Sequence, residues 1–158
     1  MCTSKRKNGI DGSMIKIICL GKIKEQYLNE MIDDYKKRIS KYHKLEIIEL
    51  KDTNNLEEEA TNINKYLSNQ DYIISLDIEG KQIDSIELSK LIDETFNHNS
   101  TITFIIGSSN GLSNTIKEKS NLRLSFSKMT FPHGLFRAML LEQIYRSFKI
   151  LNNETYHK

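Results

Sequence analysis

Residues with the potential for chemistry gather at three places where a predicted strand ends. The first is Leu76, the second is the glycine-rich segment Gly107–Gly111, and the third is the segment Ser125–Phe131. Glycine lets a backbone approach a ligand closely, and exposed backbone N–H groups can hydrogen-bond to its polar edges. Because the C-terminal ends of parallel strands lie on the same edge of a sheet, we expect these three segments to line one crevice.

The glycine-rich segment is weak evidence when it is taken by itself. It is not a Walker loop, since no Lys-Ser/Thr pair follows the second glycine, and it is not a complete G-x-G-x-x-G motif. A turn that only reverses the chain would also contain such glycines. If a ligand binds there, a side chain at Gly107 would occupy the space that it needs. We therefore expect Gly107→Val to block the site and to leave the fold intact.

Four residues near the C-terminus are candidates for catalysis. His133 follows the only proline, Pro132, at a predicted helix start, where its imidazole could exchange protons near neutral pH or only hydrogen-bond locally. Arg137, one turn later, could bind a phosphate or a carboxylate, or form a surface ion pair. Tyr156 and His157 combine an aromatic ring with a titratable group. Terminal residues usually fray, and their removal should then cost little stability.

Residue types and spacing exclude several classes of function. The sequence suggests no Ser-His-Asp triad, and its His, Cys and Asp residues are not clustered in a way that could hold a metal. Cys2 and Cys19 lack metal-like spacing, so we expect reduced thiols in a cytoplasmic protein. No apolar run is long enough to span a bilayer, and no signal-peptide pattern is visible.

The formal net charge of +2 comes entirely from the N-terminus. Residues 1–13, which look like a disordered or vector-derived extension, hold three basic residues and one acidic residue, and the rest of the chain is neutral. Net charge therefore gives no argument for binding to nucleic acid. From Ser120 onward, however, six Lys and Arg residues outnumber two Glu residues, so the last quarter is locally basic.

Strand and helix patterns alternate from residue 14 to the C-terminus. Apolar runs predict strands, and three- or four-residue apolar spacing predicts helices. The strands are expected at Met14–Leu20, Leu45–Leu50, Tyr72–Ile78, Thr101–Ile106 and from Leu122, and the helices at Lys24–Ser40, Leu56–Leu67, Ser85–Phe96, Ser113–Lys119 and from the Pro132 region to Leu151. The alternation predicts a single α/β domain over residues 14–158, with a mostly parallel sheet and helices on both faces.

The last predicted helix is apolar on nearly all sides. Leu135, Phe136, Met139 and Leu140 lie outside the stripe that the apolar residues from Leu141 to Leu151 form. A helix of this kind is buried on two sides. We expect its own sheet on one side and a second copy of the chain on the other, which predicts a homodimer.

The sequence resembles the SPOUT superfamily of methyltransferases, and within it the small enzymes that act on ribosomal RNA. The resemblance spans residues 14–158, and the motifs that carry it are Gly107–Gly111, Leu124–His133, Glu142–Lys149 and Tyr156–Lys158. It implies an α/β fold with a C-terminal trefoil knot, a homodimer, and S-adenosyl-L-methionine as methyl donor. The implied substrate is a pseudouridine of 23S rRNA in assembled ribosomes, methylated at the base nitrogen N3.

The resemblance also implies which residues act. The cofactor contacts that it carries over are Leu76, Gly107, Phe126, Ser127, Lys128, Met129, Thr130 and Phe131. Relatives commonly have a glycine in place of Ser108, whose side chain could crowd the cofactor or point outward. A base would help to remove the weakly acidic N3 proton of the uracil ring. The candidates are His133, Arg137 and, from the same or the partner subunit, Tyr156 and His157.

Two other functions remain open at this point. One is a SPOUT methyltransferase that acts on transfer RNA. The other is a non-catalytic nucleotide-binding α/β domain, which would need only the glycine-rich segment and the strand-end crevice. This last alternative leaves the segment Ser127–His133 without a role.

Overall fold

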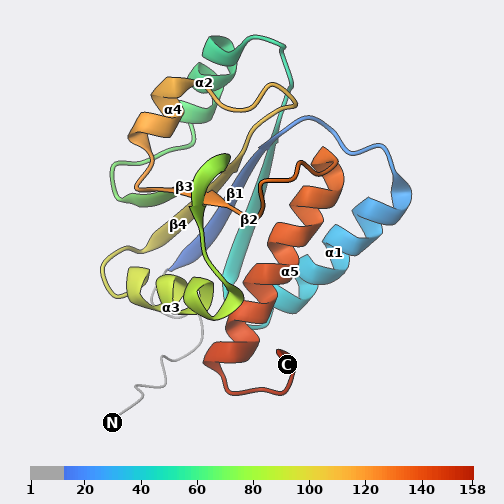
Figure 1. Cartoon of the computed structure of the whole chain (residues 1–158), viewed down its shortest axis with the longest axis vertical. Coiled ribbons are helices and arrows are strands. Elements are labelled where there is room, and N and C mark those ends of the chain that lie inside the picture. The colour runs from blue at the N-terminus through green and yellow to red at the C-terminus, as the bar shows by residue number, and fades with distance from the viewer. Residues whose placement is uncertain (1–12) are drawn as a thin grey trace.

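Strands and helices alternate through residues 13–158, the part of the chain that the computed structural model describes (Figure 1). The strands are β1 (Met14–Leu20), β2 (Lys44–Leu50), β3 (Asp71–Gln82), β4 (Thr101–Ile106) and β5 (Leu122–Ser125). The helices are α1 (Gln26–Ser40), α2 (Leu56–Asn64), α3 (Ser85–Thr95), α4 (Asn114–Lys119) and α5 (His133–Leu151). Residues 1–12 of the predicted extension lie outside the described residues, whereas Ser13 is buried.

The named strands form one parallel sheet in the order β2-β1-β4-β3-β5. Along β1, Ile15, Ile17 and Cys19 belong to the core under α1, α3 and α5, whereas Ile18 and Leu20 belong to the smaller core under α2 and α4. A parallel sheet buried on both faces needs apolar residues on both sides of its strands, which is why these strands read as continuous apolar runs. The predicted α/β architecture is therefore confirmed.

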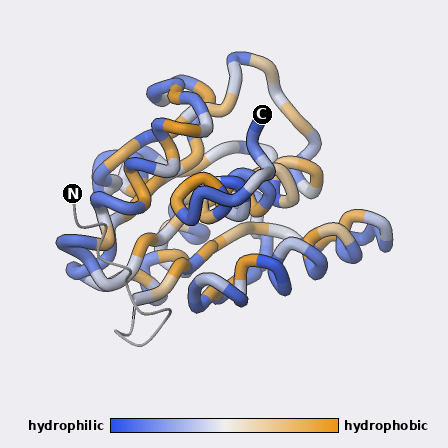
Figure 2. The backbone as a smooth tube through the Cα atoms, turned by 90° about the horizontal axis from the view of Figure 1, so that it is seen from below, coloured by the Kyte–Doolittle hydropathy of each residue, from blue (hydrophilic) through white to orange (hydrophobic). Residues whose placement is uncertain are grey.

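The helices cover the sheet with one face and present the other to solvent. In the tube coloured by hydropathy, hydrophobic and hydrophilic residues mix along each outer helix, as this arrangement requires (Figure 2). Local signals set the helix starts: the Asn55 side chain accepts hydrogen bonds from the backbone N–H groups of Glu57 and Glu58, and Asp84 forms a capping box with Glu87. Within residues 13–158, no helix has the length and apolar character needed to cross a membrane.

Helix α5 starts in the Pro132 region, as the sequence predicts. Pro132 precedes the first helical residue as the N-cap, and no side chain caps the helix there. The Pro132 carbonyl accepts a 2.9 Å hydrogen bond from the Phe136 N–H. The fixed backbone angle of proline thus directs the chain from β5 into α5.

The strand expected at Tyr72–Ile78 is longer in the structure, because β3 continues to Gln82. Leu76 and Lys81 of β3 both pair with Leu124 of β5, so residues 77–80 arch out beside β5 (Figure 1). A Cβ atom at Gly80 would lie 2.6 Å from the Arg123 carbonyl oxygen. Glycine is required here for the close approach of two backbones.

Candidate functional site

A cavity of about 630 Å³ lies at the C-terminal edge of the sheet. The ends of β3 and β4 and the segment that follows β5 line it together, as expected for parallel strands. Among its lining residues are Leu76, Gly107, Phe126, Ser127, Met129, Thr130 and Phe131. Of the eight cofactor residues that the sequence suggested, the cavity lining lacks Lys128, which is exposed.

Gly107 is needed by the loop that contains it. A Cβ atom at this position would lie 2.5 Å from the Gly111 carbonyl oxygen and 3.0 Å from a carbon of the Leu112 side chain. The loop is closed by a 2.8 Å hydrogen bond from the Gly111 N–H to the Ser108 carbonyl. Our expectation that Gly107→Val would leave the fold intact was therefore wrong, because backbone already occupies that space.

The Ser108 side chain is turned toward α2. Its hydroxyl donates a 3.2 Å hydrogen bond to Glu59 Oε1, and Glu59 Oε2 accepts one of 3.0 Å from the Thr53 N–H. Both Ser108 and Glu59 are buried. Ser108 is among the residues that line the cavity, but its hydroxyl is directed to Glu59 and ties the glycine loop to α2.

The segment after β5 is held by local hydrogen bonds and by aromatic packing. The Ser127 hydroxyl accepts a 3.0 Å hydrogen bond from the Met129 N–H. The rings of Phe126 and Phe131 pack on Phe136 of α5, with centroids 5.1 and 6.3 Å from it. The segment is thus fixed to the start of α5 and forms one wall of the cavity.

His133 lines the same cavity at the first residue of α5. Its Nε2 lies 3.4 Å from an Nη2 atom of Arg137. Partial burial, and next the positive charge of Arg137, lower the pKa of His133 below its usual 6.5, against smaller opposing effects from the Leu20 carbonyl, Asp52 and Glu49. The imidazole is therefore neutral at neutral pH and can accept a proton.

Arg137 points away from the cavity. It is 2% exposed, and its guanidinium donates to Glu49 Oε2 at 2.6 Å and to the Gly21 carbonyl at 2.9 Å. It does not line the cavity. These contacts tie the start of α5 to the ends of β1 and β2, and among them only the approach to His133 links Arg137 to a residue that lines the cavity.

Two charged residues that the sequence reasoning missed also line the cavity. Asp77 follows Leu76 on β3, and Lys117 lies on α4. The Lys117 ammonium lies 3.7 Å from Asp77 Oδ2, a distance that allows an ion pair but is too long for a hydrogen bond. Asp77 Oδ2 is buried and has no hydrogen-bond partner in the described structure. The position of Asp77 directly after a predicted contact residue was the available signal.

The tail residues fold back onto the middle of α5. The Tyr156 hydroxyl donates to Glu142 Oε1 at 3.1 Å, its ring packs on Tyr145 with centroids 5.0 Å apart, and His157 Nδ1 lies 3.1 Å from Arg146 Nη1. On α5, Glu142 and Arg146 follow His133 by 9 and 13 residues, which is about 14 and 20 Å along the helix at 1.5 Å per residue. Within one chain, the structure does not bring the tail to the cavity.

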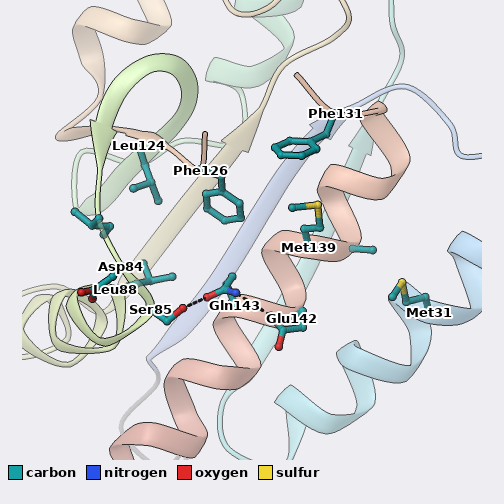
Figure 3. Close-up of a pocket in the computed structure, with 12 residues that line it drawn as sticks. Met31, Asp84, Ser85, Leu88, Leu124, Phe126, Phe131, Met139, Glu142 and Gln143 are labelled. Atoms are coloured by element: carbon teal, nitrogen blue, oxygen red, sulfur yellow. Dashed lines mark hydrogen bonds between the residues drawn. The ribbon is translucent and has the colours of Figure 1, made fainter. Parts of the chain in front are cut away.

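A second cavity, of about 440 Å³, lies over the gap between α3 and α5 (Figure 3). Leu124, Phe126 and Phe131 line both cavities. Met139 of α5 and Met31 of α1 also line it, and a 2.6 Å hydrogen bond from the Ser85 hydroxyl to Gln143 joins α3 to α5 (Figure 3).

No metal centre is found in residues 13–158, where no group of three or more His, Cys, Asp or Glu side chains could hold an ion. Cys19 is free and buried, and Cys2 lies outside the described residues. The pKa of the Cys19 thiol is raised to about 11, mainly because the thiol is buried. The thiol is therefore protonated and unreactive at neutral pH.

Comparison with known proteins identifies the family. The family model described as "Predicted SPOUT methyltransferase" matches residues 14–157. The chain is 52% identical over 157 residues to the ribosomal RNA large subunit methyltransferase H of Clostridium botulinum, covering 91% of this chain and 99% of that protein. It is 44% identical over 154 residues to the protein of the same name from Caldicellulosiruptor saccharolyticus, covering 92% of this chain and 100% of that protein.

A solved structure supports the fold independently. "A probable methylase family protein" from Haemophilus influenzae superposes with a TM-score of 0.56 at 14% identity, covering 91% of this chain and 70% of that one. At this identity the likeness concerns the fold alone. Together with the family model and the full-length relatives, it leads to one conclusion: the chain belongs to the SPOUT methyltransferase family.

Proposed function

We propose that this protein transfers a methyl group from S-adenosyl-L-methionine to N3 of a pseudouridine in the 23S rRNA of the large ribosomal subunit. One observation carries the proposal. In a chain with full-length relatives named ribosomal RNA large subunit methyltransferase H, seven residues at the family's cofactor positions line one cavity. A non-catalytic nucleotide-binding domain would not need the ordered segment between Ser127 and His133.

The residues around the cavity fit the proposed cofactor. Its volume of about 630 Å³ lies in the usual range for a site that encloses a small molecule. Leu76, Phe126 and Phe131 offer apolar surface to a nucleoside, and the loop at Gly107 offers backbone groups. Asp77 adds a buried carboxylate oxygen without a hydrogen-bond partner in the described structure, which suits a ligand that carries positive charge.

The residues of the chain hold the reactants in place and take up one proton. When it is bound, the cofactor supplies an electrophilic methyl group on a sulfonium. Holding the reacting nitrogen in line with that methyl group removes much of the barrier to transfer. The apolar walls keep water out, and His133, as a neutral imidazole beside the cavity, accepts the N3 proton. Arg137 positions His133, while Tyr156 and His157 contribute from the partner subunit.

The active form in this proposal is a homodimer. Around the second cavity, large apolar side chains are exposed: Met31 lines its open side, Tyr27 lies one turn before Met31, and Ile86 follows Ser85. Their exposed fractions are 42%, 70% and 44%, respectively. A second copy packed on this face would bury them and could bring its own tail toward the first cavity.

The SPOUT relationship also implies a trefoil knot. A ribosomal substrate places the protein in the cytoplasm. The locally basic stretch from Ser120 onward could contact rRNA phosphates.

The direct test of the function is transfer of labelled methyl groups from S-adenosyl-L-methionine. We expect transfer to assembled ribosomes that lack the modification, and little or none to free 23S rRNA or transfer RNA. Methylation of transfer RNA alone would favour the other kind of SPOUT enzyme. Calorimetric binding of ATP but not of S-adenosyl-L-methionine would favour the non-catalytic nucleotide-binding domain.

A further inference from the structure

We propose that Asp77 and Lys117 together bind the amino-acid end of S-adenosyl-L-methionine, with Asp77 accepting from its α-ammonium and Lys117 pairing with its carboxylate. The inference rests on the proposed function, because it assigns one end of the same cavity. It adds two residues, from β3 and α4, to the cofactor positions that the family resemblance carries over.

The state of Asp77 carries the inference. The residue is 8% exposed, and its Oδ1 already accepts a 3.1 Å hydrogen bond from the Glu79 N–H. Its Oδ2 is buried, lacks a hydrogen-bond partner in the described structure and belongs to a side chain that lines the cavity. A buried carboxylate oxygen left without a donor is costly, so a donor supplied by the ligand would be strongly favoured.

Asp77 is also held firmly in place. The arch of residues 77–80 is packed so closely on β5 that a Cβ atom at Gly80 would lie 2.6 Å from the Arg123 carbonyl oxygen and 2.9 Å from the Asp77 carbonyl oxygen. The hydrogen bond from the Glu79 N–H to Oδ1 holds the carboxylate itself on this arch. A fixed acceptor of this kind binds a donor without loss of its own conformational freedom.

The pairing of charges decides which part of the cofactor is bound. Among the residues that line this cavity, Asp77 is the only acid and Lys117 the only lysine, and their charged atoms are 3.7 Å apart. An α-amino acid carries an ammonium and a carboxylate next to each other, so it matches this pair charge for charge. A ribose diol would also donate to Asp77, but it would leave the role of Lys117 unexplained.

Two ligands that differ only in this end separate these assignments. S-adenosylhomocysteine has the amino-acid end, and 5′-methylthioadenosine has the same nucleoside thioether without it. By calorimetry, we expect Asp77→Asn to weaken S-adenosylhomocysteine binding by roughly 10- to 100-fold, as for a lost charged hydrogen bond. Binding of 5′-methylthioadenosine should change by less than about threefold. Lys117→Glu should show the same selectivity and does not depend on the Asp77 variant folding.

Glu79→Gln is the matched control, since it removes an exposed acid from the same arch and should change neither affinity. Equal weakening of both ligands by Asp77→Asn would assign Asp77 to the ribose and overturn the inference, as would unchanged binding of both ligands in folded variants. If the wild-type protein binds neither ligand, the proposed function fails together with the inference. If the wild-type protein binds and methylates but shows no selectivity in the variants, only the inference fails.

Discussion

Two residues one helical turn apart on α5 face different surroundings. His133 lines the cavity, whereas Arg137 turns back to Glu49 and the Gly21 carbonyl. Glu49 remains substantially exposed, with 42% of its side chain accessible, while the Arg137 side chain is 3% accessible. The ion pair thus orders a buried guanidinium, whose nearby charge in turn disfavours protonation of His133.

The lowered pKa of His133 should make stability depend on pH. Below the usual value of 6.5, the unfolded chain binds a proton at this histidine that the folded chain resists. The unfolding free energy should therefore fall as the pH drops from about 6.5 toward the lowered pKa of the folded state. Above a pH of about 6.5, this contribution to stability should be fully present. Denaturant unfolding at several pH values should show a shallower slope for His133→Asn than for the wild type.

His98→Asn makes the same change of residue type at an exposed histidine and is the matched control. The same lowering of the pKa leaves His133 neutral and able to accept a proton at neutral pH. Identical slopes for His133→Asn and the wild type would contradict the lowered pKa and weaken the assignment of His133 as the base.

Single residues also show how far the sequence could predict the site. The three cofactor segments were predictable, because parallel strands place their ends on one edge. The ion pair of Asp77 and Lys117 was not predictable, since the two residues are far apart in the chain. They meet only because β3 pairs with β5, the strand that follows α4. The orientation of Ser108 likewise depends on Glu59, a residue of another helix.

At the scale of elements, the glycine loop after β4 is tied to α2. Glu59 of α2 accepts from the Ser108 hydroxyl and from the Thr53 N–H, so one buried carboxylate joins the loop to the chain that precedes α2. The nearly continuous apolar strands made the sheet predictable. The arch in β3 was not, because Glu79-Gly80-Lys81 has the residue types of an ordinary turn and only its packing on β5 reveals the glycine's purpose.

The tie between Ser108 and Glu59 can be tested by removing the hydroxyl. Ser108→Ala leaves a buried carboxylate oxygen without its donor and should lower the unfolding free energy by about 1–2 kcal/mol. Because the hydroxyl points toward α2, S-adenosyl-L-methionine affinity should change by less than about twofold. Denaturant unfolding and calorimetry measure the two effects, and Asn110→Ala, at an exposed position of the same loop that does not line the cavity, serves as control. A large loss of affinity with unchanged stability would mean that the hydroxyl contacts the ligand.

At the scale of the whole molecule, the tail is ordered but distant from its own cavity. Tyr156 is half-buried, and the Arg146 guanidinium lies 4.9 Å from its ring centroid. Glu154 binds the Lys149 ammonium at 2.6 Å and accepts from the Tyr42 hydroxyl at 2.9 Å. Our expectation that the tail frays, and that its loss costs little stability, is therefore wrong for Tyr156, which packs against the main core.

In the proposed dimer, the two halves of the active site belong to different subunits. The cavity lies at the start of α5, and Tyr156 packs on Glu142 and Tyr145, about 14 to 18 Å along the helix from His133. A two-fold dimer through the face around Met31 and Met139 would bring each tail toward the other subunit's cavity. Apolar periodicity could suggest the dimer, but a knot lies outside what such patterns can predict, since chains are normally unknotted.

Mixing two inactive variants tests this division between subunits. Deletion of residues 156–158 should leave cofactor binding intact and abolish methylation of ribosomes, while Thr130→Trp should fill the cavity and abolish cofactor binding, which calorimetry can confirm first. In a mixed dimer, the truncated subunit supplies an intact cavity and the Thr130→Trp subunit an intact tail. Random reassociation gives half mixed dimers with one complete site each, so about a quarter of the wild-type rate should return.

The recovery should depend on exchange of subunits. Activity should appear only after the two variants have been denatured and refolded together, or incubated long enough to exchange, and it should not appear on brief mixing. His157→Ala in place of the deletion keeps the Tyr156 packing and separates loss of chemistry from loss of stability. If the deletion variant methylates ribosomes by itself, the tail takes no part in the reaction. If the mixture stays inactive although light scattering shows mixed dimers, each tail serves its own chain, and the α5 geometry would have to change on binding to the ribosome.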